Sequence, residues 1–179
     1  MIYALILLAA GCRLVPHPPN LTPVLAVALF GGAHPQAGTR PRRIAWAVPL
    51  LAMVVSDLAL GYPLGWMSAV IYACFLTAVG IGQWLRDRRT WGRTLAAALA
   101  GSVLFYAVTN FAVWLAPPFM YEHTAAGLLR CYTLALPFFR NSLAGDLYWT
   151  AALFGLHDLA QAWANARRAQ TVPGPEGMI

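Results

Sequence analysis

Polar residues that could take part in binding or catalysis interrupt this otherwise apolar chain at a few places. The first is the stretch Arg13–Asn20, which holds a cation, the imidazole of His17 and three prolines between two apolar runs. Proline has a fixed φ and no backbone N–H, so a helix cannot continue through this stretch. Non-helical backbone at membrane depth occurs only inside protein or beside water. The stretch is therefore either part of a polar site or an ordinary exposed turn.

Asp57 is the most informative single residue, because it follows Val54-Val55-Ser56 near the end of an apolar run. A carboxylate within a bilayer costs about 2.5–3.5 kcal/mol on insertion scales. We therefore expect Asp57 to face the protein interior and to pair with Arg13 or Arg140. Such a pair would form either a wall or gate of a binding site or a structural tie between helices.

Further polar and aromatic residues lie near the same ends of the apolar runs. Asp146 belongs to this group, and Trp66 fits either a ligand contact or an aromatic belt at a membrane interface. The candidate substrate-binding set from these positions is His17, Asn20, Asp57, Tyr62, Trp66, Asn110, Tyr132, Arg140 and Asn141.

Catalytic and metal-binding patterns are missing from the sequence. It has no G-x-S-x-G, no H-E-x-x-H and no P-loop, and its three cysteines lie far apart. We therefore expect a protein that is not an enzyme and has no cofactor of its own. Uphill transport would need energy from a partner or from a gradient.

The composition is that of a membrane protein. The chain is 60% hydrophobic and 10% charged, whereas soluble domains carry about 25% charged residues. The net charge of +6 comes wholly from arginine. These arginines flank apolar runs, which indicates membrane orientation and not nucleic-acid binding.

The apolar runs predict an all-α, polytopic membrane protein with six segments. The first two are short against the roughly 20 residues that cross a bilayer, so they either borrow flanking residues or form a half-depth hairpin. Residues 1–163 should form a single transmembrane domain, and residues 164–179 a basic, disordered tail. The six segments are Met1–Val15, Leu21–Ala33, Ile44–Leu60, Trp66–Leu85, Thr94–Leu115 and Leu143–Trp163.

The arginine-rich stretches, at residues 40–43, 86–93 and 167–168, fall on one face of a six-segment chain. That face should be cytoplasmic, with both termini inside. The loops Pro16–Asn20, Gly61–Gly65 and Pro117–Asn141 would then face outward, the last with a short helical run ended by Pro137. Ala28 and Gly32 form a small-xxx-small pair that would let another helix approach closely.

Several long motifs resemble those of one family. They are Arg13-Leu-Val-Pro-His-Pro-Pro-Asn-Leu-Thr-Pro23, Ser56-Asp-Leu-Ala-Leu-Gly61 and the run from Gly127 to Asn141 that ends Pro-Phe-Phe-Arg-Asn. The chain resembles small bacterial membrane proteins labelled as transport proteins. These are similar to the substrate-binding (S) components of energy-coupling-factor vitamin transporters, and to the BtuM-type cobalamin transporters.

The resemblance implies a six-helix S-component bundle in the bacterial inner membrane, with a pocket open to the outside. It implies uptake of a vitamin or related cofactor precursor, with cobalamin or another corrinoid as the first guess. An energy-coupling module with ATPase subunits would be the partner. His17, Asp57, Tyr72 and Arg140 match positions that matter in the cobalamin branch.

One departure concerns cobalt. The cobalamin branch is expected to offer a cysteine a few residues before the matching tyrosine, but residues 65–71 contain none here. Met67 is the nearest sulfur, so Met67 or His17 would be the contact to a corrinoid cobalt. Cys74 lies beyond Tyr72.

Two other functions remain open on the residues alone. One is a membrane enzyme acting on a lipid or isoprenoid, with His17, Asp57 and Arg140 as its polar centre. The other is a non-transporting scaffold subunit.

Overall fold

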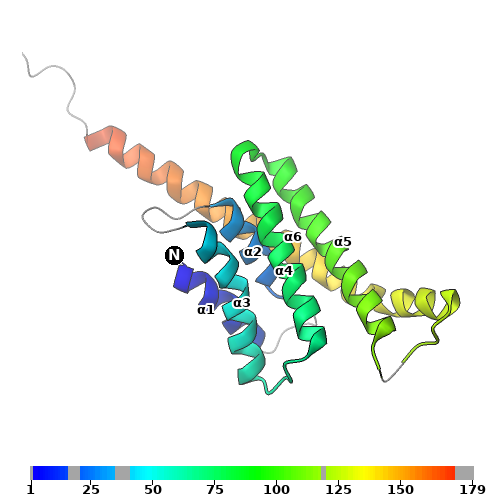
Figure 1. Cartoon of the computed structure of the whole chain (residues 1–179). Coiled ribbons are helices and arrows are strands. Elements are labelled where there is room, and N and C mark those ends of the chain that lie inside the picture. Colours follow the sequence, from blue (N-terminus) through cyan, green and yellow to red (C-terminus); the bar gives the residue numbers. More distant parts are fainter. Residues whose placement is uncertain (1, 16–20, 35–40, 118–119, 172–179) are drawn as a thin grey trace, which may run out of the picture.

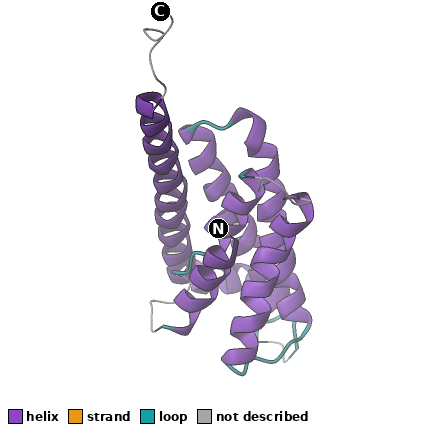
Figure 2. Cartoon of the chain, turned by 90° about the vertical axis from the view of Figure 1, so that its left-hand side faces the viewer, coloured by secondary structure: helices purple, strands orange, loops and turns teal. Residues whose placement is uncertain are grey.

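The computed structural model describes residues 2–15, 21–34, 41–117 and 120–171. This part of the chain is all-helical and contains no strand (Figures 1 and 2). The prediction of an all-α chain with six helices is thus confirmed. The helices are α1 (Ile2–Leu14), α2 (Val24–Ala33), α3 (Pro41–Ala59), α4 (Trp66–Leu85), α5 (Trp91–Leu115) and α6 (Ala125–Thr171), with a short 3₁₀ turn η1 (Arg86–Arg88) after α4.

The short helix α2 forms the centre of the bundle and packs against each of the other five helices. Its side chains from Val24 to Phe30 are all buried. A helix that is apolar on every side needs neighbours on every side, and the remaining helices supply them. With ten residues, α2 is only about 15 Å long.

Glycines set the close contact between α2 and α4. A Cβ added to Gly32 would clash with the carbonyl oxygen of Val79, and one added to Gly82 would clash with that of Leu29. Each glycine therefore lets the backbone of the opposite helix approach. The predicted close approach at Gly32 is confirmed, and Ala28 is fully buried beside it.

The helix α6 differs from the sequence prediction. A short helical run ended by Pro137 was expected before Asn141, and α6 does begin at Ala125, but it continues through Pro137 to Thr171. It also passes Trp163, so residues 164–171 of the expected disordered tail are helical. Proline in a helix costs one backbone hydrogen bond. Packing of α6 against the bundle on both sides of Pro137 outweighs this local cost, and a rule based on the local sequence does not include such packing.

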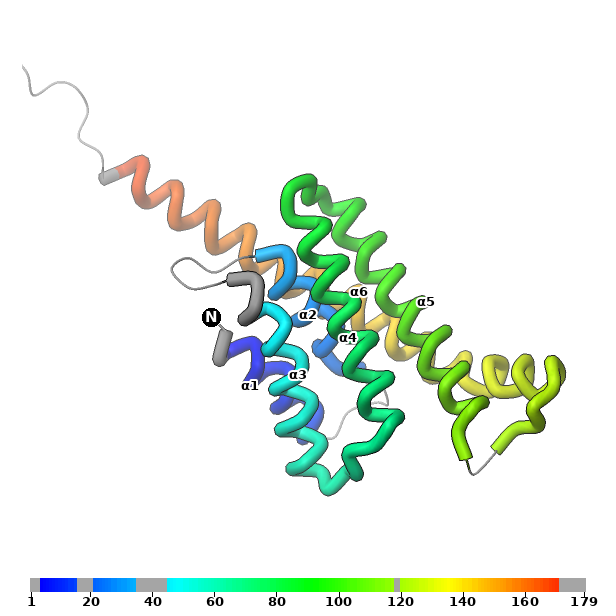
Figure 3. The backbone as a smooth tube through the Cα atoms, viewed as in Figure 1, coloured from blue at the N-terminus to red at the C-terminus, as the bar shows by residue number. Residues whose placement is uncertain are grey.

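The direction of α6 changes near Pro137. Asp146 meets Ser102 and Tyr132 meets Tyr106. From the helical rise, these contacts are about 21 Å apart along α6 but only about 6 Å apart along α5. The two helices therefore cannot run side by side over this interval, and Figure 3 shows the yellow part of α6 turning away from its orange part.

The helix ends fall into two groups. The start of α3, the α4–α5 connection and the end of α6 lie toward the upper part of Figure 1. The α3–α4 connection and the end of α5 lie toward the lower part. The arginine-bearing η1 and the Arg167–Arg168 pair are thus in the upper group.

Two helical stretches are long and apolar enough to cross a membrane, Trp66–Arg88 and Trp91–Leu115. Three further apolar helical stretches are shorter, at Ala4–Leu14, Val24–Ala33 and Ala45–Ala59.

Candidate functional site

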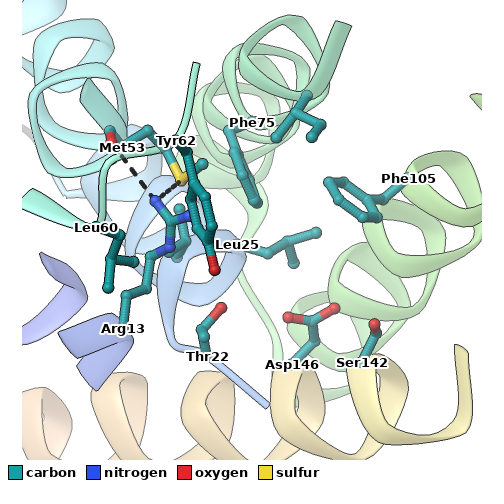
Figure 4. Close-up of a pocket in the computed structure, with 12 residues that line it drawn as sticks. Arg13, Thr22, Leu25, Met53, Leu60, Tyr62, Phe75, Phe105, Ser142 and Asp146 are labelled. Atoms are coloured by element: carbon teal, nitrogen blue, oxygen red, sulfur yellow. Dashed lines mark hydrogen bonds between the residues drawn. The ribbon is translucent and has the colours of Figure 1, made fainter. Parts of the chain in front are cut away.

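A cavity of about 350 Å³ lies at the N-terminal end of α2 and is lined by residues from all six helices (Figure 4). It exists because α2 is short: α2 fills only part of the length of the bundle, and the longer helices continue past its first turn. The lining residues are Arg13, Thr22, Val24, Leu25, Met53, Leu60, Tyr62, Ile71, Phe75, Phe105, Ser142 and Asp146.

An ion pair between α1 and α3 supports one wall of the cavity, where Arg13 is a lining residue and Asp57 is not. The Nη2 atom of Arg13 donates to Oδ1 of Asp57 at 2.6 Å, and Nη1 donates to the Ser56 hydroxyl at 2.5 Å. The Arg13 and Asp57 side chains are 15% and 7% exposed. The predicted pairing of Asp57 with Arg13 is therefore confirmed. It joins the end of α1 to α3.

Tyr72 of α4 also bonds to Asp57 and, like Asp57, is not among the residues that line the cavity. Its hydroxyl donates to the other carboxylate oxygen of Asp57 at 2.7 Å. Asp57 thus accepts a charged donor on one oxygen and a phenol on the other, so both oxygens are satisfied. The resulting network fixes α1, α3 and α4 relative to one another.

The end of α3 places Tyr62 at the cavity. The N–H of Tyr62 donates to the carbonyl of Asp57, and the N–H of Gly61 to that of Leu58. With Gly61 at φ 71°, this is the Schellman arrangement, in which a left-handed residue ends the helix. Glycine suits this position because it has no Cβ to strain.

The opposite wall carries a second carboxylate, Asp146 on α6. It is 6% exposed, and its Oδ2 accepts a hydrogen bond from the Ser102 hydroxyl of α5 at 2.7 Å. Ser142 lines the cavity one turn earlier on α6. Figure 4 shows Asp146 and Ser142 on the side of the cavity away from the Arg13 guanidinium.

Aromatic rings form much of the remaining surface. Phe75 of α4 and Phe105 of α5 lie with ring centroids 5.4 Å apart and planes at 32°. Tyr62 adds a third ring on the Arg13 side. The cavity therefore combines a neutralised ion pair, a lone carboxylate and aromatic faces.

The predicted site residues fall into several groups. Tyr62 lines the cavity on the Arg13 side, whereas Asp57 and Tyr72 bond to each other but do not line it. Trp66 is half exposed and Met67 half buried at the start of α4, and neither lines the cavity. His17 and Asn20 lie outside the described residues.

Asn110 and Tyr132 belong to a separate contact between α5 and α6. The Tyr132 hydroxyl donates to the carbonyl of Ala107, and the Asn110 side chain to that of Tyr106. The Cys131 thiol donates to the Asn110 carbonyl at 3.4 Å. The bonds of Tyr132 and Cys131 hold the first part of α6 against α5, whereas the Asn110 side-chain bond lies within α5, and none of these residues lines the cavity.

Of the two partners predicted for Asp57, Arg140 is not the one found. Arg140 is exposed, and Asn141 beside it is half buried. The reason is helical geometry, because six residues place Arg140 about 120° around α6 from the buried face that carries Asp146. Arg13 supplies the inward cation in its place.

Sequence reasoning assigned no site role to several residues that line the cavity. Arg13 was considered only as a partner for Asp57, and Asp146 only as a polar residue near a loop. The spacing of Ser142, Asp146 and Thr150, each four residues apart and all buried, is a signal for one helix face. The aromatic lining from Phe75 and Phe105 had no such signal, since apolar residues surround both.

A second polar cluster lies at the other end of the bundle. The His34 ring stacks on His157 with centroids 4.1 Å apart, and the Arg89 guanidinium pairs with Asp158 at 2.5 Å. Burial and the nearby His157 lower the pKa of His34 to about 4. Over the described ranges, no group of three or more His, Cys, Asp or Glu side chains could hold a metal ion.

Comparison with known proteins identifies one family. The model of the family described as "Family of unknown function (DUF6580)" matches residues 1–169. No curated protein and no solved structure matches the chain.

Proposed function

Because this chain belongs to the DUF6580 family, whose function is unknown, we propose its role from its own geometry. We propose that it is a membrane-embedded binding protein for the uptake of a small organic molecule, which the cavity beside α2 receives. The observation that carries this proposal is the cavity itself, because every helix of the bundle contributes to its lining.

The surface supports membrane insertion. On α5, the large side chains Leu95, Leu99 and Val103 are exposed at a spacing of four residues, and on α6 Leu156, Leu159 and Trp163 are exposed. Soluble monomers rarely expose contiguous apolar surface of this kind. In a bilayer the same side chains would contact lipid.

Length and charge support a defined orientation. From the helical rise, α4 is about 30 Å long and α5 about 37 Å, which matches a hydrocarbon core of about 30 Å. We place the arginine-bearing end, with η1 and the end of α6, in the cytoplasm of a bacterial cell. The cavity then lies in the outer half of the membrane, near the α3–α4 connection.

The size and lining of the cavity fit ligand binding. Small-molecule sites usually have volumes of about 300–1,000 Å³ and mostly apolar walls with a few placed polar groups. The volume of about 350 Å³ is at the small end of this range. A corrinoid, with its macrocycle and side arms, is larger than this space, so we favour a smaller vitamin-like molecule as the ligand.

The mechanism we propose begins with capture from the outer side. The ligand enters past Tyr62, lies against the rings of Phe75 and Phe105, and is enclosed by the bundle. Release to the cytoplasm would require reorientation of the helices, driven by an energy-coupling partner or by a gradient.

Native mass spectrometry tests binding directly. The protein is purified in mild detergent without added ligand, and bound adducts are measured. We expect an adduct on the unchanged protein and on Ala73→Trp, whose new ring would point outward because Ala73 is exposed. Ile71→Trp places the same ring in the cavity lining and should lose the adduct. An adduct retained by Ile71→Trp, or absent from all three proteins, would contradict the proposal.

Cysteine labelling tests the orientation. In a variant without the three native cysteines, Tyr62→Cys should react with a membrane-impermeant maleimide added to intact cells. Asp87→Cys in η1 should react only after the cells are opened. The reverse pattern would contradict the proposed topology, and equal labelling of both in intact cells would contradict membrane insertion.

A further inference from the structure

The charge of the cavity points to the chemistry of its ligand. We infer that the ligand is an organic cation, with a protonated or permanently charged nitrogen that pairs with Asp146 and an apolar body that lies against the aromatic wall. This inference rests on the proposed function and names the substrate class of the same cavity.

The two carboxylates at the cavity have different partners. Asp57 accepts bonds from the Arg13 guanidinium and from the Tyr72 hydroxyl. Asp146 accepts only the Ser102 hydroxyl, and no salt bridge joins it to a basic side chain among the described residues. Among the described residues, Arg13 in the lining is balanced by its partner Asp57, and Asp146 in the lining has no such partner.

Arg13 cannot serve both carboxylates. Nη1 and Nη2 of its guanidinium are directed to Ser56, Met53 and Asp57. Figure 4 shows Asp146 across the cavity from this group. The Asp146 carboxyl therefore faces the empty space of the site, and no basic side chain among the described residues pairs with it.

The Ser102 bond is a weak substitute for a cation. Ser102 has one hydroxyl proton, and its Oγ lies 3.0 Å from the carbonyl of Ala98 as well as 2.7 Å from Asp146. A buried carboxylate without a counter-charge is costly, because it has lost its hydration and gained no cation in return. A ligand cation that pairs with Asp146 would remove this cost, so occupancy favours positive ligands over neutral ones.

The backbone does not reverse this preference. The N-terminus of α2 points toward the cavity and contributes about half a positive elementary charge. That is less than the full charge of the Asp146 carboxylate.

The aromatic wall fits the remainder of such a ligand. Cations bind over ring faces within about 6 Å of the centroid, and this attraction is stronger when water is excluded. Phe75 and Phe105 line the same cavity as Asp146. A nitrogen cation at the carboxylate would therefore have ring surface beside it for its apolar groups.

A matched series of probes separates charge from shape. The probes are 2-phenylethylamine, which is cationic at pH 7.5, 2-phenylethanol, which is neutral, and 3-phenylpropanoate, which is anionic. The measurement is the rise of the thermal unfolding midpoint of the full-length protein in detergent, since a ligand that binds the folded state raises it with concentration. We expect the amine to bind at least tenfold more tightly than the alcohol, and the carboxylate not to bind.

Two aspartate variants on α6 assign the preference to its residue. Asp146→Asn keeps an acceptor for Ser102 but removes the charge, so the amine should bind at least tenfold more weakly. Asp158→Asn makes the same chemical change at a carboxylate outside the cavity lining and should keep the response. If Asp146→Asn does not fold, the ranking of the three probes on the unchanged protein decides the question alone.

The outcomes separate the two proposals. If the alcohol or the carboxylate binds as tightly as the amine, or Asp146→Asn keeps the preference, the cation inference is wrong while the binding function stands. If none of the probes binds up to millimolar concentration and native mass spectrometry finds no adduct, both proposals fail.

Discussion

The ion pair between Arg13 and Asp57 should be a major determinant of stability at the cavity. Asp57→Asn leaves the Arg13 guanidinium, with a side chain only 15% exposed, without its counter-ion. Removing one partner of a buried pair costs about 3–5 kcal/mol. We expect a loss near 3 kcal/mol in the free energy of unfolding, because Arg13 keeps its bond to Ser56.

The double variant gives the sharper test. Arg13→Met with Asp57→Leu replaces the pair by apolar groups, and such replacements are often neutral. The Tyr72 hydroxyl loses its acceptor, which costs about 1 kcal/mol. The double variant should therefore be only about 1 kcal/mol less stable than the unchanged protein, and clearly more stable than either single variant.

The assay is a double-mutant cycle of unfolding free energies, measured by circular dichroism during titration with sodium dodecyl sulfate in mixed micelles. The four proteins give a coupling energy for the pair, which we expect to exceed about 2 kcal/mol. Additive single effects, each below about 1 kcal/mol, would refute the reasoning, since they would mean that the pair is solvated and not part of the cavity wall.

Two further predictions concern the opposite half of the bundle. Gly32→Ala should lower the free energy of unfolding by about 1–3 kcal/mol in the same assay, because the new methyl group meets the Val79 backbone. Gly31→Ala is the control: nothing lies within 4 Å of a Cβ there, so the change should be neutral or stabilising. A folded-state pKa of about 4 for His34, against 6.5 when it is exposed, means that below pH 6.5 the unfolded chain takes up a proton that the folded chain does not. The thermal midpoint should therefore fall between pH 6.5 and pH 4, and His34→Phe should reduce this fall; an unchanged pH profile in that variant would rule out His34 as its source.

Hydrophobic runs in the sequence located most of the helices. The predicted segment Trp66–Leu85 coincides with α4, because Gly65 before it and the charged residues after it mark both ends. The pairing of Asp57 was also predictable, since a carboxylate in an apolar run needs a cation and Arg13 is one of few available. Local sequence was thus sufficient to predict most of the helices and the ion pair that joins two of them.

Around Pro137, the rule that proline ends a helix gives the wrong prediction. Proline predicted the end of a helix, and the residues before Asn141 were interpreted as a loop folded onto the bundle. The structure keeps α6 helical there, because packing against α5 stabilises it on both sides of the proline. Arg140 then lies on the exposed side of α6, and a correct prediction of its direction required the helix to be known first.

The role of Asp146 depends on tertiary structure in a different way. Its burial follows from the four-residue spacing with Ser142 and Thr150, which the sequence contains. Its position in a cavity follows from the shortness of α2, which leaves space beside the first turn of that helix. No local pattern encodes the empty volume, because it results from the unequal lengths of packed helices.

The central claim is that the cavity beside α2 holds a small organic ligand. The most direct measurement is an experimental density map of the protein purified with the molecule that it retains. We predict density in contact with Asp146 and with the rings of Phe75 and Phe105. A map with this space collapsed, or with the retained molecule bound elsewhere, would contradict the account.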